Sequence, residues 1–248
     1  MSKLPFLLSP DPRAPFPPAH LALREPDGLL AIGGDLSPVR LLNAYRHGIF
    51  PWFSEGQPPL WWSPDPRTVF RSEGVRLSSK FRRGLRHSRW QVRADGAFAE
   101  VLAHCAQAPR RGQSGTWITE AMQAAYLELH ALGHAHSIEV YDDDRLVGGL
   151  YGVAIGRMFF GESMFSAASG GSKVALAALA WRLAEWGWPL IDAQVENEHL
   201  LSLGAESWPR PRFLQALARQ VALAAPAGHW RTVFAPLAAA ELAGQLPP

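Results

Sequence analysis

The run Gly148-Gly-Leu-Tyr-Gly-Val-Ala-Ile-Gly-Arg-Met-Phe-Phe-Gly-Glu-Ser-Met-Phe-Ser166 decides the fold of this chain. Its density of apolar and aromatic residues predicts two strands joined at Gly156 and Arg157. Five glycines interrupt the run, and glycine weakens a strand unless a backbone or a ligand must come close. One acid, Glu162, lies among aromatic residues, where an unpaired carboxylate would be costly. The run alone leaves two interpretations open: a glycine-rich sheet core with one edge acid, or part of a functional site.

On both sides of this run, apolar periodicity and capping residues predict further elements. The best-defined helix start is Ser37, an N-cap followed by Pro38 in the first turn, and Gly48 is expected to end that helix. Residues 1–28 are rich in proline and are expected to form an extended arm, and residues 112–118 a flexible link. Further helices are expected at 78–87, 97–108, 119–132, 172–186 and 211–224, and strands at 136–141, 146–155, 158–166 and 189–195.

After residue 112 the expected order is helix, antiparallel strands, helix and strand. This order predicts an α+β fold in which a mixed sheet is flanked by helices, the layout of acetyltransferase-like domains. Residues 1–70 are interpreted as a separate small N-terminal domain. Residues 71–248 are interpreted as the acetyltransferase-like C-terminal domain.

Composition and charge restrict the class of protein. The chain has 248 residues, of which 48% are hydrophobic and 19% charged, so it can bury one large core or two smaller ones. A formal net charge of +2 confines any nucleic-acid site to a local patch. The single cysteine, Cys105, excludes an internal disulfide and fits a reducing compartment. Because no apolar run could span a bilayer and the N-terminus has no signal-peptide pattern, we expect a cytoplasmic protein that does not bind membranes.

Two features before residue 94 are candidates for nucleic-acid binding. Trp52, Trp61 and Trp62 lie close together among prolines and could form a stiff aromatic wall, although such tryptophans often only pack a small domain. Between residues 71 and 93, eight cations stand against one acid, which exceeds the usual mix of a solvated face. The basic segment is therefore interpreted as a contact for a phosphate backbone, with a solvated surface as the alternative.

Asp192 and Gln194 are the clearest polar pair in the second half of the chain. They are two residues apart on a predicted strand and are therefore expected to point to one face. In that arrangement the carboxylate would fix the amide, and the amide oxygen would accept a hydrogen bond from an amine. The alternative is that the pair caps the next turn together with Asn197 and His199.

Other motifs carry little signal. His134 and His136 form a His-x-His pair, but no third ligand has a recognisable spacing, so no metal is expected. The glycine pairs at 33–34 and 170–171 could hold a phosphate at a helix start, but neither matches a known phosphate fingerprint and both are interpreted as turns. No Ser-His-Asp or Cys-His signature is present.

Several runs, in order over about residues 26–213, resemble the leucyl/phenylalanyl-tRNA–protein transferases. They include Gly-Ile-Phe-Pro-Trp at 48–52 and Gly-Glu-Ser-Met-Phe-Ser at 161–166. A set of long runs in the family's order is much more specific than any single motif. The matching runs lie at 28–42, 44–53, 60–67, 115–119, 134–140, 147–154, 161–166, 190–195 and 202–206.

The resemblance implies an aminoacyltransferase that moves Leu or Phe from its tRNA to a protein whose N-terminal residue is Arg or Lys. The new peptide bond gives the protein a bulky N-terminus, which marks it for degradation. The implied partners are Leu-tRNA, Phe-tRNA and these acceptor proteins. Neither a cofactor nor a metal is implied, and we expect a monomer.

The resemblance also implies roles for individual residues. Trp52 and Trp117 correspond to the pair that holds the terminal adenosine, which suits the stacking of an unpaired base on aromatic faces. Glu162, Asp192 and Gln194 correspond to the polar catalytic group. The pocket for the transferred side chain corresponds to Leu150, Phe159, Leu179 and Ile191, and the tRNA-contacting cluster to Lys80, Arg82, Arg83, Arg86 and Arg89.

The mechanism expected from these residues is attack of the acceptor amine on an ester that is already activated. Asp192 would polarise Gln194, which accepts a hydrogen bond from the amine, while Glu162 positions the acceptor. A ribose hydroxyl of the tRNA that shuttles the proton is the alternative. Two other classes, an acetyltransferase using acyl-CoA and a non-catalytic RNA-binding module, explain fewer of the runs. The first also lacks its pyrophosphate loop before residue 172.

Overall fold

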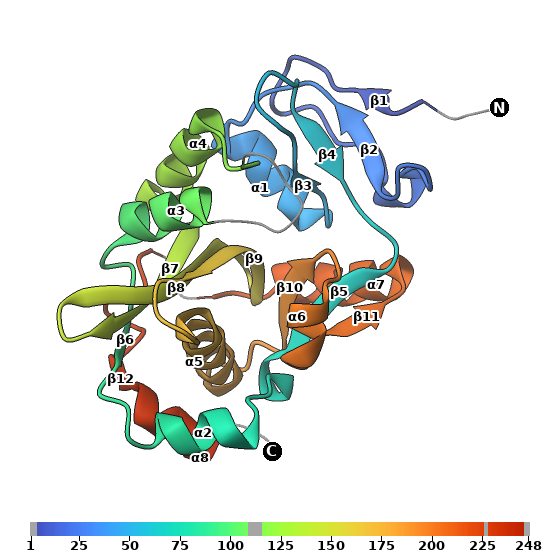
Figure 1. Ribbon diagram of the computed structural model, residues 1–248. Coiled ribbons are helices and arrows are strands. Elements are labelled where there is room, and N and C mark those ends of the chain that lie inside the picture. Colours follow the sequence, from blue (N-terminus) through green and yellow to red (C-terminus); the bar gives the residue numbers. More distant parts are fainter. Residues whose placement is uncertain (1–3, 109–115, 226–227, 246–248) are drawn as a thin grey trace.

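A computed structural model describes residues 4–108, 116–225 and 228–245. Within them the chain forms one small and one large β-sheet, with helices packed on both faces of the large one (Figure 1). The predicted α+β class with a mixed sheet is confirmed. Most of the predicted link at 112–118 lies outside the described residues.

The N-terminal region is built on a four-stranded sheet in the order β1-β2-β4-β3. The strands are β1 (Phe6–Leu7), β2 (Leu29–Ile32), β3 (Phe50–Pro51) and β4 (Leu60–Trp62). Helix α1 (Pro38–Arg46) starts after Ser37 and has Pro38 in its first turn, as predicted. Gly48 follows the helix with a φ of 73°, a left-handed conformation that glycine adopts readily.

The large sheet has eight strands in the order β11-β5-β10-β9-β8-β7-β6-β12. Only β9 and β10 pair in parallel; the other neighbours in this sheet are antiparallel. The strands are β5 (Arg67–Arg71), β6 (Gln91–Ala94), β7 (Ala135–Asp142), β8 (Arg145–Ile155), β9 (Met158–Ser166), β10 (Leu190–Gln194), β11 (Glu206–Trp208) and β12 (Leu237–Ala238).

The parallel strands β9 and β10 separate halfway along, and this separation creates room for a site. Their pairing ends at Asp192 and Phe160. Between Asp192 and Gln194 the register of β10 shifts, and Gln194 has a φ of 61°. Beyond this point residues 161–164 of β9 and 193–195 of β10 and the segment after it line one cavity, described below.

Helix α5 (Gly171–Glu185) covers one face of the large sheet, and α3 (Phe98–Gln107) and α4 (Glu120–Ala131) cover the other (Figure 1). The glycines of the 148–166 run make this approach possible. A Cβ on Gly148 would lie 2.4 Å from backbone atoms of Gly171, so α5 could not reach β8 with any larger residue there. The remaining helices are α2 (Ser79–Leu85), α6 (Glu198–Ser202), α7 (Arg210–Val221) and α8 (Leu242–Gln245).

The predicted helices and strands after residue 70 are confirmed within a few residues at each end. Strands β5, β6, β11 and β12 were not predicted. One apolar cluster contains Leu41 and Trp61 of the N-terminal region together with Val101 and Tyr151. Within the described residues, no helix combines the length and the apolar character that crossing a membrane requires.

Candidate active site

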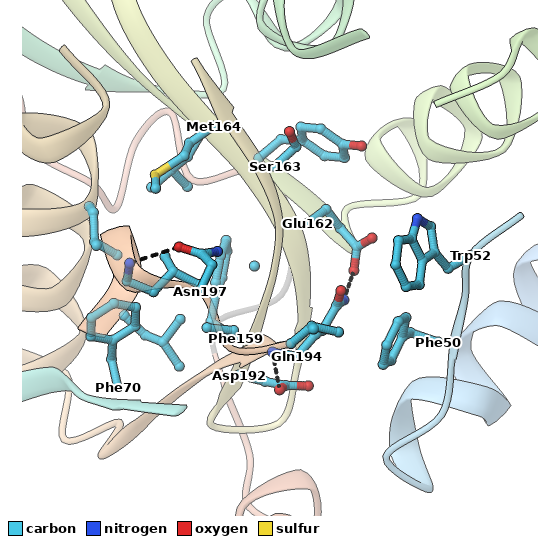
Figure 2. A pocket seen from close by; sticks show the side chains of 18 of the residues that line it. Phe50, Trp52, Phe70, Phe159, Glu162, Ser163, Met164, Asp192, Gln194 and Asn197 are labelled. Atoms are coloured by element: carbon cyan, nitrogen blue, oxygen red, sulfur yellow. Dashed lines mark hydrogen bonds between the residues drawn. The ribbon is translucent and has the colours of Figure 1, made fainter. Parts of the chain in front are cut away.

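A cavity of about 410 Å³ opens where β9 and β10 separate (Figure 2). Its lining residues come from the N-terminal region, from Trp117, from β8, β9 and β10, and from α5 and the start of α6. The structure thus brings together nine residues that the sequence assigned to three separate roles. They are Trp52, Trp117, Leu150, Phe159, Glu162, Leu179, Ile191, Asp192 and Gln194.

One side of the cavity is apolar. Leu150, Phe159, Leu179 and Ile191 are all at most 4% exposed and belong to the core cluster around α5. Phe70, Met164 and Leu176 extend this side, and the sequence did not single them out. The shape and chemistry suit a branched or aromatic side chain of moderate size.

The tryptophans differ from the predicted aromatic wall. Trp52 is partly buried, lines the cavity and makes a tilted contact with Trp62 at 5.8 Å between ring centroids. Trp61 is fully buried, and its Nε1 donates to the carbonyl of Gly33, so it packs the N-terminal region instead. Trp117 joins Trp52 at the cavity from a different part of the chain.

Glu162 accepts hydrogen bonds from three neutral groups. Tyr45 Oη donates to Oε1 at 2.8 Å, Tyr126 Oη to Oε2 at 2.6 Å, and Gln194 Nε2 to Oε1 at 2.7 Å. Burial raises the pKa of Glu162 to about 7, and the three donors and the nearby Asp192 modify that effect. Burial also raises the pKa of both tyrosines, with the charge of Glu162 as the second cause. Glu162 is therefore a carboxyl group that changes protonation near neutral pH.

Asp192 has a different kind of partner. It is fully buried, and Arg67 of β5 donates to both of its oxygens, Nε to Oδ1 at 2.8 Å and Nη2 to Oδ2 at 2.6 Å. Arg67 also donates to the carbonyl of Gly48 and lies over the rings of Phe50 and Phe213. The carboxylate is thus neutralised by a two-pronged, geometrically fixed ion pair.

Gln194 connects the two carboxylates, but not in the predicted way. The expected contact between the carboxylate of Asp192 and the side-chain amide is wrong: Asp192 Oδ1 accepts from the backbone N–H of Gln194 at 3.0 Å. The amide is fixed by Glu162 instead (Figure 2). The physical reason is the register shift in β10, which breaks the two-residue alternation that the prediction assumed. Among the described residues none donates to Gln194 Oε1, which leaves this oxygen available to a substrate.

The capping interpretation also holds for one neighbour. Asn197 begins α6, and its side chain accepts from the backbone N–H of Leu200. Asn197 lines the cavity beside this cap. The cap of α6 is therefore Asn197 alone, and the catalytic role of Asp192 and Gln194 stays a prediction.

The basic segment lies on α2 and the residues directly after it, and none of its cations lines the cavity. Lys80, Arg83, Arg86 and Arg89 are exposed, whereas Arg82 is partly buried and donates to the carbonyl of Ala243. The five residues thus divide into four solvated cations and one that fixes the C-terminal part of the chain.

A second polar cluster surrounds Asp95. Asp95, His130 and His229 have ligand atoms within 4.8 Å of one another, and within the described ranges this is the group that could hold a metal ion. Asp95 is already engaged: Oδ2 accepts from His136 Nδ1 and from the backbone N–H of Trp230, and Oδ1 from that of Ser137. The absence of a metal stays a prediction.

Besides the apolar residues named above, sequence reasoning missed the residues that hold the two acids, namely Tyr45, Arg67 and Tyr126. Tyr45 and Arg67 lie inside runs that carried the family resemblance, but no role was assigned to them. Tyr126 is a buried residue of α4, inside the helix predicted at 119–132. A buried carboxylate needs hydrogen-bond donors or a counter-charge. A search for hydroxyl and guanidinium donors to the two acids could therefore have found these residues.

Comparison with known proteins identifies the family of this chain. The model of the leucyl/phenylalanyl-tRNA protein transferase family matches residues 69–218, and that of its N-terminal domain matches residues 34–65. The chain belongs to this family. A leucyl/phenylalanyl-tRNA–protein transferase of Xanthomonas campestris pv. campestris (strain B100) is 68% identical over 97% of both chains. One of Xylella fastidiosa (strain M23) is 64% identical over 94% of this chain and 96% of its own.

Among solved structures, a ribosomal-protein-alanine N-acetyltransferase from Brucella melitensis biovar Abortus 2308 matches with a TM-score of 0.33 and 18% identity. The match covers 56% of this chain and 94% of that one.

Proposed function

We propose that this protein transfers Leu or Phe from aminoacyl-tRNA to the N-terminal Arg or Lys of acceptor proteins. The observation that carries the proposal is the single cavity that joins an apolar pocket, two tryptophans and a fixed glutamine amide. Membership of the transferase family supports the same reaction. The product would carry an N-terminal degradation signal.

In this proposal the 3′ end of the tRNA binds by stacking and burial. Trp52 and Trp117 hold the terminal adenine, since aromatic faces bind an unpaired base by its π-face. The transferred side chain enters the apolar side of the cavity at Leu150, Phe159, Leu179 and Ile191. Both anchors fix the ester that joins amino acid and ribose near the polar edge, where Gln194 lies.

The reaction forms one bond and breaks one. The neutral amine nitrogen of the acceptor bonds to the ester carbonyl carbon, and the bond from that carbon to the ribose oxygen breaks. The proton that the amine loses ends on the leaving ribose oxygen. Gln194 Oε1 accepts a hydrogen bond from the attacking amine and orients it; an amide is too weak a base to keep the proton. Holding the amine and the ester together in one site contributes about 7–11 kcal/mol in favourable cases, and orientation by Gln194 is one part of that effect.

The two carboxylates have separate roles in the proposal. Glu162 holds the amide of Gln194 through Nε2, so that Oε1 faces the substrate. Its charge, present above a pH of about 7, also attracts the cationic N-terminal residue of the acceptor. Asp192 acts through the backbone and does not contact the substrate. Together with Arg67 it fixes the backbone of Gln194 in its left-handed conformation.

The proposal also covers tRNA contact, domain organisation, location, oligomeric state and cofactor. The exposed cations Lys80 and Arg83 of α2, and Arg86 and Arg89 after it, contact the tRNA backbone together with Arg82. Residues 1–70 act as a small N-terminal domain, and 71–248 as the transfer domain. The enzyme works as a cytoplasmic monomer without a cofactor.

The decisive test is transfer of radiolabelled Leu from Leu-tRNA to a peptide that begins with Arg. The same peptide beginning with Ala and a sample treated with ribonuclease are the controls. Labelling should require both the Arg N-terminus and intact tRNA. Binding of tRNA without any labelling would refute the proposal and favour a non-catalytic RNA-binding protein.

A further inference from the structure

A second cavity, of about 240 Å³, lies at the other end of β7 and β8 and shares no residue with the first. Its lining residues come from the end of α1, the end of α4, the turn between β8 and β9 and the segment after α7. The lining residues that carry the argument are Arg46, Leu132, His134, His136, Trp188 and Val221.

The charged residues that line this cavity are all of one sign. Arg46 is a cation, His134 and His136 offer ring nitrogens as hydrogen-bond donors, and the lining contains no Asp or Glu. Arg46 is exposed, and no described residue accepts a hydrogen bond from its guanidinium. Burial lowers the pKa of His134, and Arg46 and then His136 lower it further. An anion bound between Arg46 and His134 would favour the protonated form of His134 and so offset this lowering of its pKa.

The buried histidine is held in a fixed orientation. His136 is 1% exposed, lies flat on the indole of Trp230 at 4.1 Å, and has its Nδ1 2.8 Å from Asp95 Oδ2. Asp95 also accepts from two backbone N–H groups, so it cannot turn to other partners. Within the described part of the chain, His136 Nε2 has no hydrogen-bond partner. A ring this deeply buried, oriented by a carboxylate and lining a cavity with its second nitrogen unused, is arranged to bind a ligand.

From this cavity we infer a binding site for a small organic oxyanion, a carboxylate or a phosphate monoester with an apolar body. The anionic group contacts Arg46, His134 and Nε2 of His136. The body packs on Leu132, Trp188 and Val221, which form the apolar side of the same cavity. The volume is below the range of about 300–1,000 Å³ typical of drug-sized ligands, so the ligand is small.

The test uses four probes at constant pH and ionic strength: inorganic phosphate, phenyl phosphate, benzoate and the neutral benzyl alcohol. Binding is followed by isothermal titration calorimetry and by the ¹⁵N resonance of His136 Nε2. At least one of phenyl phosphate and benzoate should bind, move this resonance, and bind at least about tenfold more tightly than benzyl alcohol, since a hydrogen bond to a charged group has about that effect. Whichever of the two binds more tightly identifies the anionic group, and inorganic phosphate shows whether the apolar body is needed.

Two variants and a matched control locate the site. Arg46→Gln and His134→Gln should each weaken binding about tenfold or more. Arg219→Gln removes the same charge from an exposed position on α7 that lines neither cavity, and should leave affinity unchanged. Failure of all three anions to bind, equal binding of benzyl alcohol, an unmoved His136 resonance, or equal affinities of Arg46→Gln and Arg219→Gln would each overturn the inference.

Discussion

Two carboxylates flank Gln194, and the protein compensates them in opposite ways. Asp192 is fully buried against a guanidinium that donates to both of its oxygens. Glu162 is only partly buried and accepts from two tyrosines and one amide, none of which carries a charge. The two acids therefore have different roles. The ion pair of Asp192 with Arg67 is a fixed structural support, while Glu162 can gain or lose a proton near pH 7.

This difference explains how a short strand end can be both rigid and reactive. The ion pair holds the backbone at the register shift, where Gln194 has a φ of 61°. A residue other than glycine in this conformation is strained and persists only when its surroundings hold it. The neutral side, in contrast, orients the amide by hydrogen bonds alone. Variants of Arg67 test the ionic side, and variants of Glu162 test the neutral side.

The largest effect is expected on the ionic side. Arg67→Met should lower the free energy of unfolding by about 3–5 kcal/mol, because it leaves Asp192 buried without its counter-charge. Urea unfolding at pH 7 measures this. Arg71→Met is the matched control at the other end of β5, where the pair with Glu206 is exposed and worth less than about 1 kcal/mol. Equal losses in the two variants would mean that burial of the Asp192 pair has no special weight.

On the neutral side, the effect should depend on pH. The folded-state pKa of Glu162, about 7, lies above its usual 4.5, so the wild type loses stability as pH rises from about 4.5 to about 7. Glu162→Gln lacks this loss, and its stability relative to wild type should rise by about 1–3 kcal/mol across that window. Unfolding curves at several pH values measure the difference.

Glu206 supplies a control of opposite sign. The hydrogen bond from Trp208, followed by Arg71, lowers its pKa, so its contribution to stability grows as pH rises toward about 4.5 and is constant above that value. Glu206→Gln should therefore lose stability relative to wild type as pH rises toward about 4.5. The same slope in both variants would contradict the assignment of a raised pKa to Glu162.

Loss of base stacking on Trp52 should change the KM for Leu-tRNA and leave the KM for the peptide unchanged. Trp52→Leu should raise the KM for Leu-tRNA by about tenfold or more, since base stacking contributes about 1–3 kcal/mol, and leave the KM for the peptide unchanged. Trp181→Leu, a partly buried tryptophan that lines neither cavity, is the control. If both variants keep a wild-type KM for Leu-tRNA, Trp52 does not hold the adenosine.

The smallest effect belongs to the basic helix. Arg83→Gln and Arg86→Gln together should weaken tRNA binding and lower the salt slope of log K by about 2, because each residue neutralises one phosphate. Filter binding between 50 and 200 mM salt measures the slope. An unchanged slope would assign these cations to a solvated surface.

Much of the fold and the site could be predicted from the sequence. The hairpin at Gly156 followed from the strand pattern, and the helix after Ser37 from its cap and proline. Strands β5 and β12 were missed because both are short and join the large sheet through contacts distant in sequence. The residues of the cavity came from the family resemblance. The hydrogen bonds that join these residues could not be predicted. They depend on the register shift at Gln194 and on the donors Tyr45, Arg67 and Tyr126, which packing between distant segments brings together.

The measurement that tests the central claim is the single-turnover rate of Leu transfer by Gln194→Ala. The enzyme is saturated with Leu-tRNA and mixed with excess Arg-peptide, and Gln215→Ala, an exposed amide on α7, is the control. Because Gln194 orients the amine only during attack, the rate should fall about 10²-fold, a typical effect for such a group, while tRNA affinity stays unchanged. A wild-type rate in Gln194→Ala would contradict the account, since the amide between the two carboxylates would then have no part in the reaction.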